Sequence, residues 1–404
     1  MKTALKSPHW VTAMINELKA LYRNRTWTPF PHQSHYNVVG SRRVFKTKLK
    51  ADGSIVDRFK AQLVAKVKPL AQLLGIPLYG LFSRLLLADS SLFTLHCGTG
   101  TIYLLLHVND IIITDSSTYL LHRLITKLSS EFSMKDLGEL HYFLGIEVTK
   151  FSGGLFLSQQ KYIKDILVKN SMSESKPVAA PLTIKHDLHQ TTSVLADATQ
   201  YRQMVGSLQY LIITRPDIAH AINLVSQFMH RPTIIHLQAI KRILRYLNDT
   251  LDYGIRLLAN STLNLYSFSN GYWDGCVHTR RSTTDYNIYF GANCISWCSN
   301  KQPTVSRSST EAEHRSMAST TADITWITYL LRELEISLTK VPVLYCDNIS
   351  ALYLAKNPKF HIHTKHIELD YHFIREKVVA GSLVTRHVST TSQLADVFTK
   401  PLPK

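Results

Sequence analysis

Three acidic side chains in the last quarter of the chain lie where carboxylates often carry chemistry. Asp347 ends a predicted strand in LYCDN, Glu313 lies near the start of a predicted helix after SRSST, and Asp396 lies in LADVFTK. Side chains at strand ends commonly build the sites of α/β domains. Convergence of the three would leave them available for chemistry. Otherwise they are solvated acids at the ends of elements, and spacing alone leaves both interpretations open.

A second glutamate in the same helix has a structural explanation. Ser308 and Glu311 stand in S-x-x-E spacing, which is the pattern of a helix capping box. We therefore expect Glu311 to cap the helix and Glu313 to be the residue available for chemistry.

Polar residues also interrupt an apolar segment, TIYLLLHVNDIIITDSS, in the first half of the chain. The interruption reads His107-Val108-Asn109-Asp110, which predicts a buried β-hairpin with Asn-Asp at its tip. Asn-Asp is a common turn pair, so these two residues also have a purely structural interpretation.

The elements that must position these residues fall into three regions. A basic hairpin is predicted on either side of Ala51-Asp52-Gly53. The hairpin with Asn109-Asp110 at its tip follows, and then another around Ser152-Gly153-Gly154. Helical spacing then dominates up to a linker near 259–261. The last region alternates strands at 264–270, 287–297, 341–348 and 383–388 with helices near 309–335, 349–356, 366–379 and 391–399, which predicts a sheet covered by helices.

Composition favours a polyanionic partner. The 46 Lys and Arg residues exceed the 29 Asp and Glu residues, giving a formal charge of +17. Such an excess favours nucleic acid over a membrane surface, although scattered surface lysines also produce a basic protein. Five cysteines fit a reducing compartment, and no apolar run is long enough to span a membrane. We expect an intracellular protein, cytoplasmic or nuclear, without a signal peptide.

Long motifs in a fixed order then point to a family. RRSTTDYNIYFG, SRSSTEAEHRSMA, LYCDNISAL, TKHIELDYHFIREKV and TRHVSTTSQLADVFTKPL closely resemble the RNase H domain of copia-type LTR retrotransposon Pol polyproteins. Upstream, ADGSIVDRFKAQLVAK, the HVND hairpin, DLGELHYFLGIEV and YRQMVGSLQYLIITRPDIAHAINLVSQFM resemble the reverse transcriptase of the same polyproteins. The resemblance covers nearly the whole chain.

For the RNase H part, the resemblance implies a carboxylate site that holds two Mg²⁺ ions on an RNA:DNA hybrid. Glu313, Asp347 and Asp396 match three of its acids, and His387 matches a loop histidine of the family, although an ordinary sheet-edge histidine is an equal alternative. The fourth acid belongs in a segment that the family writes S-D-x-D-W-x-G. Here Asn270 stands in the place of that acid.

For the polymerase part, the resemblance implies a degenerate site. The family carries Tyr-Val-Asp-Asp at the hairpin tip, so that only Asp110 remains of this acidic pair, and the segment with a further upstream Asp is missing after FKAQLVAK. Basic side chains for phosphate contacts remain in the first hairpin, namely Arg58, Lys60 and Lys66.

The sequence therefore predicts a degenerate, internally deleted copia-type Pol fragment. We expect truncated reverse transcriptase fingers and palm over 1–170, a helical thumb-like region over 171–260 and an RNase H-like mixed sheet with helices over 261–404, an α+β part followed by an α/β part. RNA, DNA or their hybrid is the expected partner. We expect an inactive polymerase and a weak or inactive ribonuclease H. The alternatives are a non-catalytic basic nucleic-acid-binding protein and a transposon relic without function.

Overall fold

The computed structural model of the 404-residue chain divides by its contacts into two compact units. One comprises 1–83, 93–103 and 113–135, and the other comprises 84–92, 104–112 and 136–404. The structure describes five residues between 11 and 19, residue 188, and residues 41–49, 55–65, 82–84, 91–97, 100–107, 110–116, 118–131, 135–183, 194–276, 279–357 and 367–398.

The basic segments near the N-terminus form the predicted hairpin. Strands β1 (Ser41–Leu49) and β2 (Ile55–Ala65) are antiparallel, with Ser41 opposite Ala65 and Leu49 opposite Ile55. The predicted turn between them lies outside the described residues. Opposed strands of this kind place Arg58 and Lys60 on the same ribbon as the basic residues of β1.

The HVND segment also forms a hairpin. Strands β3 (Phe82–Arg84), β4 (Leu92–Cys97), β5 (Gly100–His107) and β6 (Asp110–Asp115) lie in the order β3-β4-β5-β6, and helix α3 (Thr118–Glu131) follows. Asp110 is the first residue of β6, whereas Val108 and Asn109 at the tip lie outside the described residues.

The second unit begins with a four-stranded antiparallel sheet of order β10-β9-β8-β7. Three of its strands are consecutive, β7 (Tyr142–Phe143), β8 (Ile146–Phe151) and β9 (Gly154–Ser158). The tight reversal between β8 and β9 places Gly153 at φ +100°, a conformation that favours glycine. The fourth strand, β10 (Ile255–Leu258), comes almost 100 residues later in the chain and closes the sheet edge beside β9.

Between β9 and β10 lies a helical bundle, as the helical spacing predicts. It comprises α4 (Gln160–Lys169), α5 (Ala198–Leu211), the short 3₁₀ helix η2 (Pro216–Ile218), α6 (Ala219–Ser226) and α7 (Ile234–Asp249). Tyr201, Val205 and Leu208 recur at helical spacing and are fully buried in the core of this bundle.

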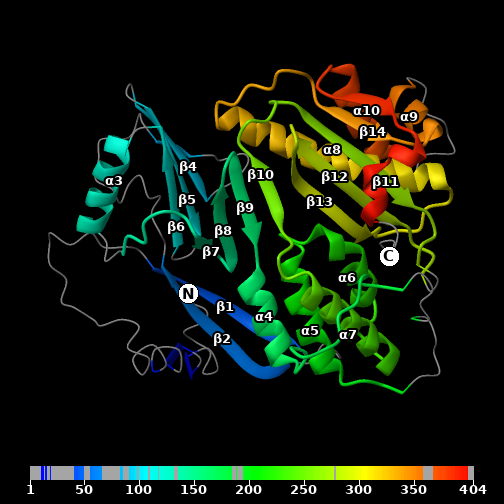
Figure 1. The fold of residues 1–404 in the computed structure, drawn as a ribbon, viewed down its shortest axis with the longest axis horizontal. Coiled ribbons are helices and arrows are strands. Elements are labelled where there is room, and N and C mark those ends of the chain that lie inside the picture. The colour runs from blue at the N-terminus through cyan, green and yellow to red at the C-terminus, as the bar shows by residue number, and fades with distance from the viewer. Residues whose placement is uncertain are drawn as a thin grey trace. The chain divides into compact units, whose positions relative to one another are not determined.

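The C-terminal part is a five-stranded mixed sheet covered by helices (Figure 1). Its strands are β11 (Leu265–Tyr272), β12 (Thr283–Phe290), β13 (Asn293–Lys301), β14 (Val343–Cys346) and β15 (Val384–His387), in the order β13-β12-β11-β14-β15. The first three strands are antiparallel, and β14 and β15 join parallel to β11. The long helix α8 (Ser309–Glu333) packs against β11 and β12, followed by α9 (Ile349–Lys356) and α10 (Glu368–Val379).

Two details of this sheet differ from the sequence prediction. The single strand expected over 287–297 is two strands, because the chain reverses at Gly291 (φ +58°) and Ala292. The last expected helix is instead a pair of short 3₁₀ helices, η4 (Thr390–Ser392) and η5 (Leu394–Phe398).

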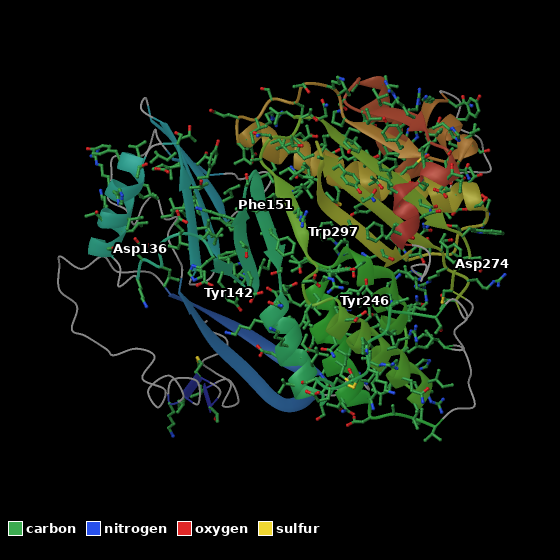
Figure 2. The ribbon with its side chains drawn as sticks, in the orientation of Figure 1. Asp136, Tyr142, Phe151, Tyr246, Asp274 and Trp297 are labelled. Atoms are coloured by element: carbon green, nitrogen blue, oxygen red, sulfur yellow. The ribbon has the colours of Figure 1, made fainter. Side chains whose placement is uncertain are left out.

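The helical bundle and the C-terminal sheet are joined by side-chain hydrogen bonds within the second unit. The indole of Trp297 on β13, labelled in Figure 2, donates to the carbonyl of Ile212 at 3.0 Å. The amide of Asn223 on α6 donates to the hydroxyl of Ser299 at 3.4 Å. The domain boundary near 260 stays a prediction. Among the described residues, no helix combines the length and the apolar character that a membrane span requires.

Candidate active site

Adjacent parallel strands bring two of the predicted site residues to one edge of the C-terminal sheet. In the register of β11 with β14, Phe268 lies opposite Tyr345. Continuing both strands by two residues leads to Asn270 and Asp347. The carboxyl ends of parallel strands meet at the same sheet edge, which explains why residues 77 positions apart become neighbours.

Helix α8 adds the next acid to this edge. Ser308 caps the helix, its hydroxyl accepting from the amide of Glu311 at 3.2 Å, and the Glu311 carboxylate accepts from the amide of Arg307 at 2.9 Å. Glu311 is therefore a capping residue, as predicted. Glu313 lies half a turn further and faces the sheet with only 6% of its surface exposed.

Glu313 and Asp347 form a compact donor cluster together with a residue that sequence reasoning missed, Cys346. Ligand atoms of the three residues lie within 4.8 Å of one another. The Cys346 thiol, fully buried, donates to Glu313 Oε2 at 3.7 Å. Its position next to Asp347 in LYCDN was the only signal in the sequence, and a cysteine in a strand is usually a core residue.

The remaining two predicted ligands also meet. The side-chain amide of Asn270 donates to Asp396 Oδ1 at 2.7 Å, and Asp396 is held on η5, which packs on β11 and β12. An aspartate at position 270 would place two carboxylates at this distance, whereas the asparagine makes a favourable hydrogen bond instead.

Burial is the largest influence on the ionisation of Glu313, the most buried carboxylate of the cluster. Burial raises the pKa of Glu313 to about 8, and the charges of Asp347 and Asp396 add to this rise. Hydrogen bonds from the Gly271 amide and the Cys346 thiol oppose it. A buried acid whose neighbours are also acids takes up a proton or shares a cation with them.

A further acid on the neighbouring strand, Asp285, was not predicted as a site residue. Its side chain is fully buried on β12 directly opposite Asn270. Burial raises the pKa of Asp285 well above its ordinary value, the nearby hydroxyl of Ser299 opposes the rise, and the charges of Glu313 and Asp396 add to it. The signal in the sequence was an acid inside a segment of strand-forming residues, STTDYNIYF.

The other predicted site residues lie outside the cluster. His387 ends β15 opposite Cys346, and its side chain is exposed. Thr390, three residues beyond it, donates to Asp347 Oδ2 at 3.0 Å. Asp110 belongs to another sheet and is exposed. Arg58 and Lys60 lie on β2, and Lys66 lies outside the described residues.

The donor chemistry of this edge fits a hard divalent cation. Carboxylate oxygens are the ligands that Mg²⁺ prefers, and Glu313, Asp347 and Asp396 offer them from three different elements. The buried, unpartnered oxygens of Asp285 add a further acceptor group close by. The Cys346 thiol is the one softer group among these donors.

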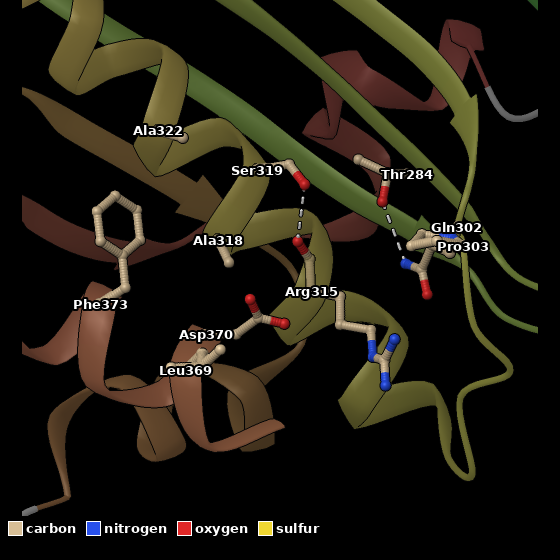
Figure 3. Close-up of a pocket in the computed structure, with 10 residues that line it drawn as sticks. All are labelled: Thr284, Gln302, Pro303, Arg315, Ala318, Ser319, Ala322, Leu369, Asp370 and Phe373. Carbon is tan, nitrogen blue, oxygen red and sulfur yellow. Dashed lines mark hydrogen bonds between the residues drawn. The ribbon is translucent and has the colours of Figure 1, made fainter. Parts of the chain in front are cut away.

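A cavity of about 400 Å³ lies elsewhere on the same domain, between α8, α10 and the start of β12 (Figure 3). In it the amide of Gln302 donates to the Thr284 hydroxyl at 3.1 Å. Arg315 and Asp370 line its polar side, and its lining includes none of the clustered carboxylates. This cavity is therefore separate from the candidate active site.

An antiparallel three-stranded meander followed by two parallel strands, with Asn270 near the end of the first strand and Asp347 directly after the fourth, defines an RNase H-like domain. Comparisons with known proteins relate the whole chain to reverse transcriptases and Pol polyproteins. A family described as "Reverse transcriptase (RNA-dependent DNA polymerase)" matches residues 82–184. The retrovirus-related Pol polyprotein from transposon RE1 of Arabidopsis thaliana is 42% identical over 489 residues, which include 99% of this chain and 33% of the relative.

An uncharacterized mitochondrial protein of Arabidopsis thaliana is 50% identical over 224 residues, covering 55% of this chain and 93% of that protein. Among solved structures, a foamy viral protease-reverse transcriptase in complex with an RNA/DNA hybrid matches with a TM-score of 0.41 at 14% identity, over 74% of this chain and 37% of that chain. The chain belongs to the copia-type retrotransposon Pol family, as the sequence motifs predicted.

Two facts about coverage bear on function. The chain spans about a third of the length of the Pol polyproteins that it matches. The alignment with the RE1 polyprotein extends over 489 positions, 85 more than the 404 residues of this chain, so at least that many positions of the alignment have no counterpart here. The excess agrees with the internal deletions expected from the sequence.

Proposed function

We propose that the chain is a retrotransposon-derived reverse transcriptase/ribonuclease H fragment whose hydrolysis of RNA in RNA:DNA hybrids is weakened by Asn270. The observation that carries this proposal is the hydrogen bond from the Asn270 amide to Asp396 beside the cluster of Glu313 and Asp347. Glu313 and Asp347 are two acids of the expected set and lie within the cluster, the charge of Asp396 acts on Glu313, and the neutral amide of Asn270 stands where the family has the fourth acid.

Glu313, Asp347 and Asp396 would hold Mg²⁺, which supplies an activated water and stabilises the leaving oxygen of a phosphodiester. Asn270 brings no charge to balance a dication, and its amide hydrogen occupies one oxygen of Asp396. A loss of several kcal/mol is reasonable for a missing charge partner in a partly desolvated site, and about 1.4 kcal/mol corresponds to a tenfold change. His387 is exposed at the end of β15, where a role in product release is compatible with its position.

The first prediction concerns the variant Asn270→Asp. We expect it to raise cleavage of a labelled RNA:DNA hybrid by at least about tenfold, because it supplies the absent charge without a change of shape. Asn300→Asp, on an exposed position of β13, is the control with the same change in charge. Asn270→Asp combined with Asp347→Asn should abolish the gain. A folded Asn270→Asp variant that cuts no faster than this double variant would show that Asn270 is not the missing ligand.

The second prediction concerns the polymerase. We expect no primer extension on an RNA template with Mg²⁺ or Mn²⁺, because Asn109 stands where the family has an acid and this chain lacks at least 85 positions of its alignment with the RE1 polyprotein, which the motifs lead us to assign to the palm. Incorporation of labelled nucleotides that depends on the template and exceeds a heat-inactivated control would contradict this expectation.

A second candidate function rests on charge and not on the carboxylates. The formal charge of +17 and the basic hairpin of β1 and β2 favour a protein that binds nucleic acid without cutting it. Arg58, Lys60 and Lys66 are the residues that we propose for phosphate contacts. The two candidates are separated by Asn270→Asp, which should change cleavage and leave electrostatic binding almost unchanged.

A further inference from the structure

Asp285 is a buried acid for which neither the fold nor the proposed reaction gives a role. It lies on the central part of β12, opposite Asn270 on β11 and opposite Ser299 on β13. Side chains of directly opposed residues project from the same face of a sheet, with Cβ atoms about 5 Å apart. Asp285 therefore projects beside Asn270 on the face that η5 covers.

The surroundings of Asp285 do not neutralise its charge. Its side chain has no exposed surface, and neither carboxylate oxygen has a hydrogen-bond partner among the residues that the structure describes. The hydroxyl of Ser299 donates instead to the carbonyl of Phe398 at 3.0 Å. The charged groups whose fields reach Asp285 are Glu313 and Asp396, and both are acids.

A buried carboxylate without a partner is costly, so it either takes up a proton or binds a cation. Compare Arg215 in the same unit, which is as deeply buried and has four hydrogen-bonded acceptor atoms. Asp285 has no such network. Its anionic neighbours make a cation the more favourable partner, because a cation reduces the repulsion among all three acids.

We propose that Asp285 is a metal ligand that, with Asp396, binds one divalent cation beside Asn270. The carboxylate missing from β11 is thus supplied by the neighbouring strand, a shift of about 4.8 Å across the sheet. The side-chain oxygen of Asn270 is then free to serve as a neutral third ligand. This assignment rests on the metal site of the proposed function and adds a residue to it.

The test measures binding of Mn²⁺ to the full chain. Electron paramagnetic resonance monitors it, because the signal of the free ion decreases as the ion binds. We compare the unmodified chain with Asp285→Asn, and with Asp252→Asn as a control that removes the same charge at an exposed position. Asp285→Asn should weaken Mn²⁺ binding by about tenfold or more, as expected for loss of a ligand or its close support. Asp252→Asn should bind within about twofold of the unmodified chain, because exposed charges at a distance are screened.

A purely structural acid would behave differently. If Asp285 only packed in the core and bound no metal, Asp285→Asn would leave Mn²⁺ affinity unchanged and shift only the melting temperature. With the proposed role, the variant loses Mn²⁺ affinity and, without metal, melts at the same or a higher temperature, because an unpaired buried charge has been removed. An unchanged Mn²⁺ affinity overturns the proposal, and so does a failure of the unmodified chain to bind Mn²⁺ at millimolar concentration.

A charge exchange between the two strands gives a second and independent readout. Asn270→Asp combined with Asp285→Asn returns the acid to β11, and its Mn²⁺ affinity should recover to within about threefold of the unmodified chain. This double variant also serves if Asp285→Asn alone does not fold. If the double variant folds and still binds Mn²⁺ as weakly as Asp285→Asn is expected to, the two strands do not exchange the ligand and the proposal is wrong.

The outcomes separate this inference from the proposed function. Loss of Mn²⁺ binding in Asp285→Asn without hybrid cleavage by any variant supports the metal ligand and rejects the ribonuclease. Cleavage restored by Asn270→Asp together with unchanged Mn²⁺ binding in Asp285→Asn supports the ribonuclease and rejects Asp285 as a ligand.

Discussion

The residue that follows Glu313 has an unusual environment for a histidine. His314 is fully buried on α8, and neither ring nitrogen has a hydrogen-bond partner among the described residues. Its ring is nearly parallel to that of Tyr371 on α10, with 6.4 Å between the ring centres. Burial lowers the pKa of His314 to about 4, so the folded protein holds this ring neutral.

This depressed pKa predicts loss of stability in mild acid. A histidine that resists protonation in the folded state binds its proton only on unfolding. Its contribution to the free energy of unfolding is therefore fully present above about pH 6.5 and is lost as the pH falls toward 4. Between pH 7.5 and 5.0 we expect the free energy of unfolding to fall by about 2 kcal/mol on account of His314. His314→Phe should remove that dependence, measured by urea denaturation at both pH values.

The comparison with His314→Phe isolates this group from Glu313 beside it. The raised pKa of Glu313 acts with the opposite sign, because its folded form takes up a proton as the pH falls below about 8. Both proteins in the comparison retain Glu313. Equal pH dependence in the two proteins would mean that His314 is protonated or hydrated in the fold.

At the residue scale, motif and spacing predicted the acids of the candidate site but not the side chains that lie beside them. Asp347, Glu313 and Asp396 were identifiable because each stands at a characteristic place in a motif. The hydrogen bond from Asn270 to Asp396 joins residues 126 positions apart and depends on how η5 packs on the sheet. Asp285 was hidden for the same reason, since only the strand register places it opposite Asn270.

At the scale of elements, one buried arginine ties the helical bundle together. Arg215, just before η2, is 1% exposed and contacts the Asp217 carboxylate at 2.6 Å. It also donates to the carbonyl and the hydroxyl of Thr250 at the end of α7, at 2.8 and 2.6 Å. The hydroxyl of Tyr246, labelled in Figure 2, completes the network by donating to Asp217 at 2.8 Å.

Loss of this arginine should be strongly destabilising. Arg215→Met leaves Asp217 without its cationic partner and removes the donor to the Thr250 carbonyl, and removing one side of a buried pair costs about 3–5 kcal/mol. Arg332→Met is the matched control, because Arg332 is exposed on α8 and lies over the Tyr329 ring at 5.0 Å, a contact worth less than about 1 kcal/mol. Urea denaturation measures both, and similar losses in the two variants would contradict a central role for Arg215.

The elements themselves were largely predictable from local pattern, and the exceptions have local causes. Helices α8, α9 and α10 begin and end close to their predicted limits, because caps and apolar spacing mark them. The strand expected over 287–297 contains a reversal that the prediction missed, since Gly291-Ala292 lies inside a segment that otherwise reads as strand. The segment 394–398 is 3₁₀ because it is held by contacts with β11 and β12, which no local pattern contains.

At the scale of the whole molecule, the positive charge is unevenly distributed along the chain. Residues 1–66 contain 13 Lys and Arg against three Asp and Glu, so that +10 of the formal +17 lies in this stretch. The acids of the candidate active site all lie beyond residue 260. The proposed contacts with nucleic acid and the proposed metal site therefore lie in different parts of the sequence, so that substitutions can test each one separately.

This separation leads to the last prediction, for the salt dependence of binding. Each neutralised phosphate releases counterions, so log K falls with log salt by about 0.7–0.9 per contact. Replacing Arg58, Lys60 and Lys66 together by Gln should lower the slope by about 2–3, measured by fluorescence anisotropy of a labelled RNA:DNA hybrid between 50 and 200 mM salt.

The control is the triple Gln variant of Lys161, Lys164 and Lys340, which removes the same net charge from exposed positions outside the basic hairpin. Binding through local phosphate contacts requires the hairpin variant to lose more of the slope than the control, because counterions are released only where phosphates are neutralised. If both variants lose the same fraction, net charge alone governs the attraction and the hairpin has no special part in it. Sequence-independent affinity in the unmodified chain is expected in either case, since phosphate contacts carry no base information.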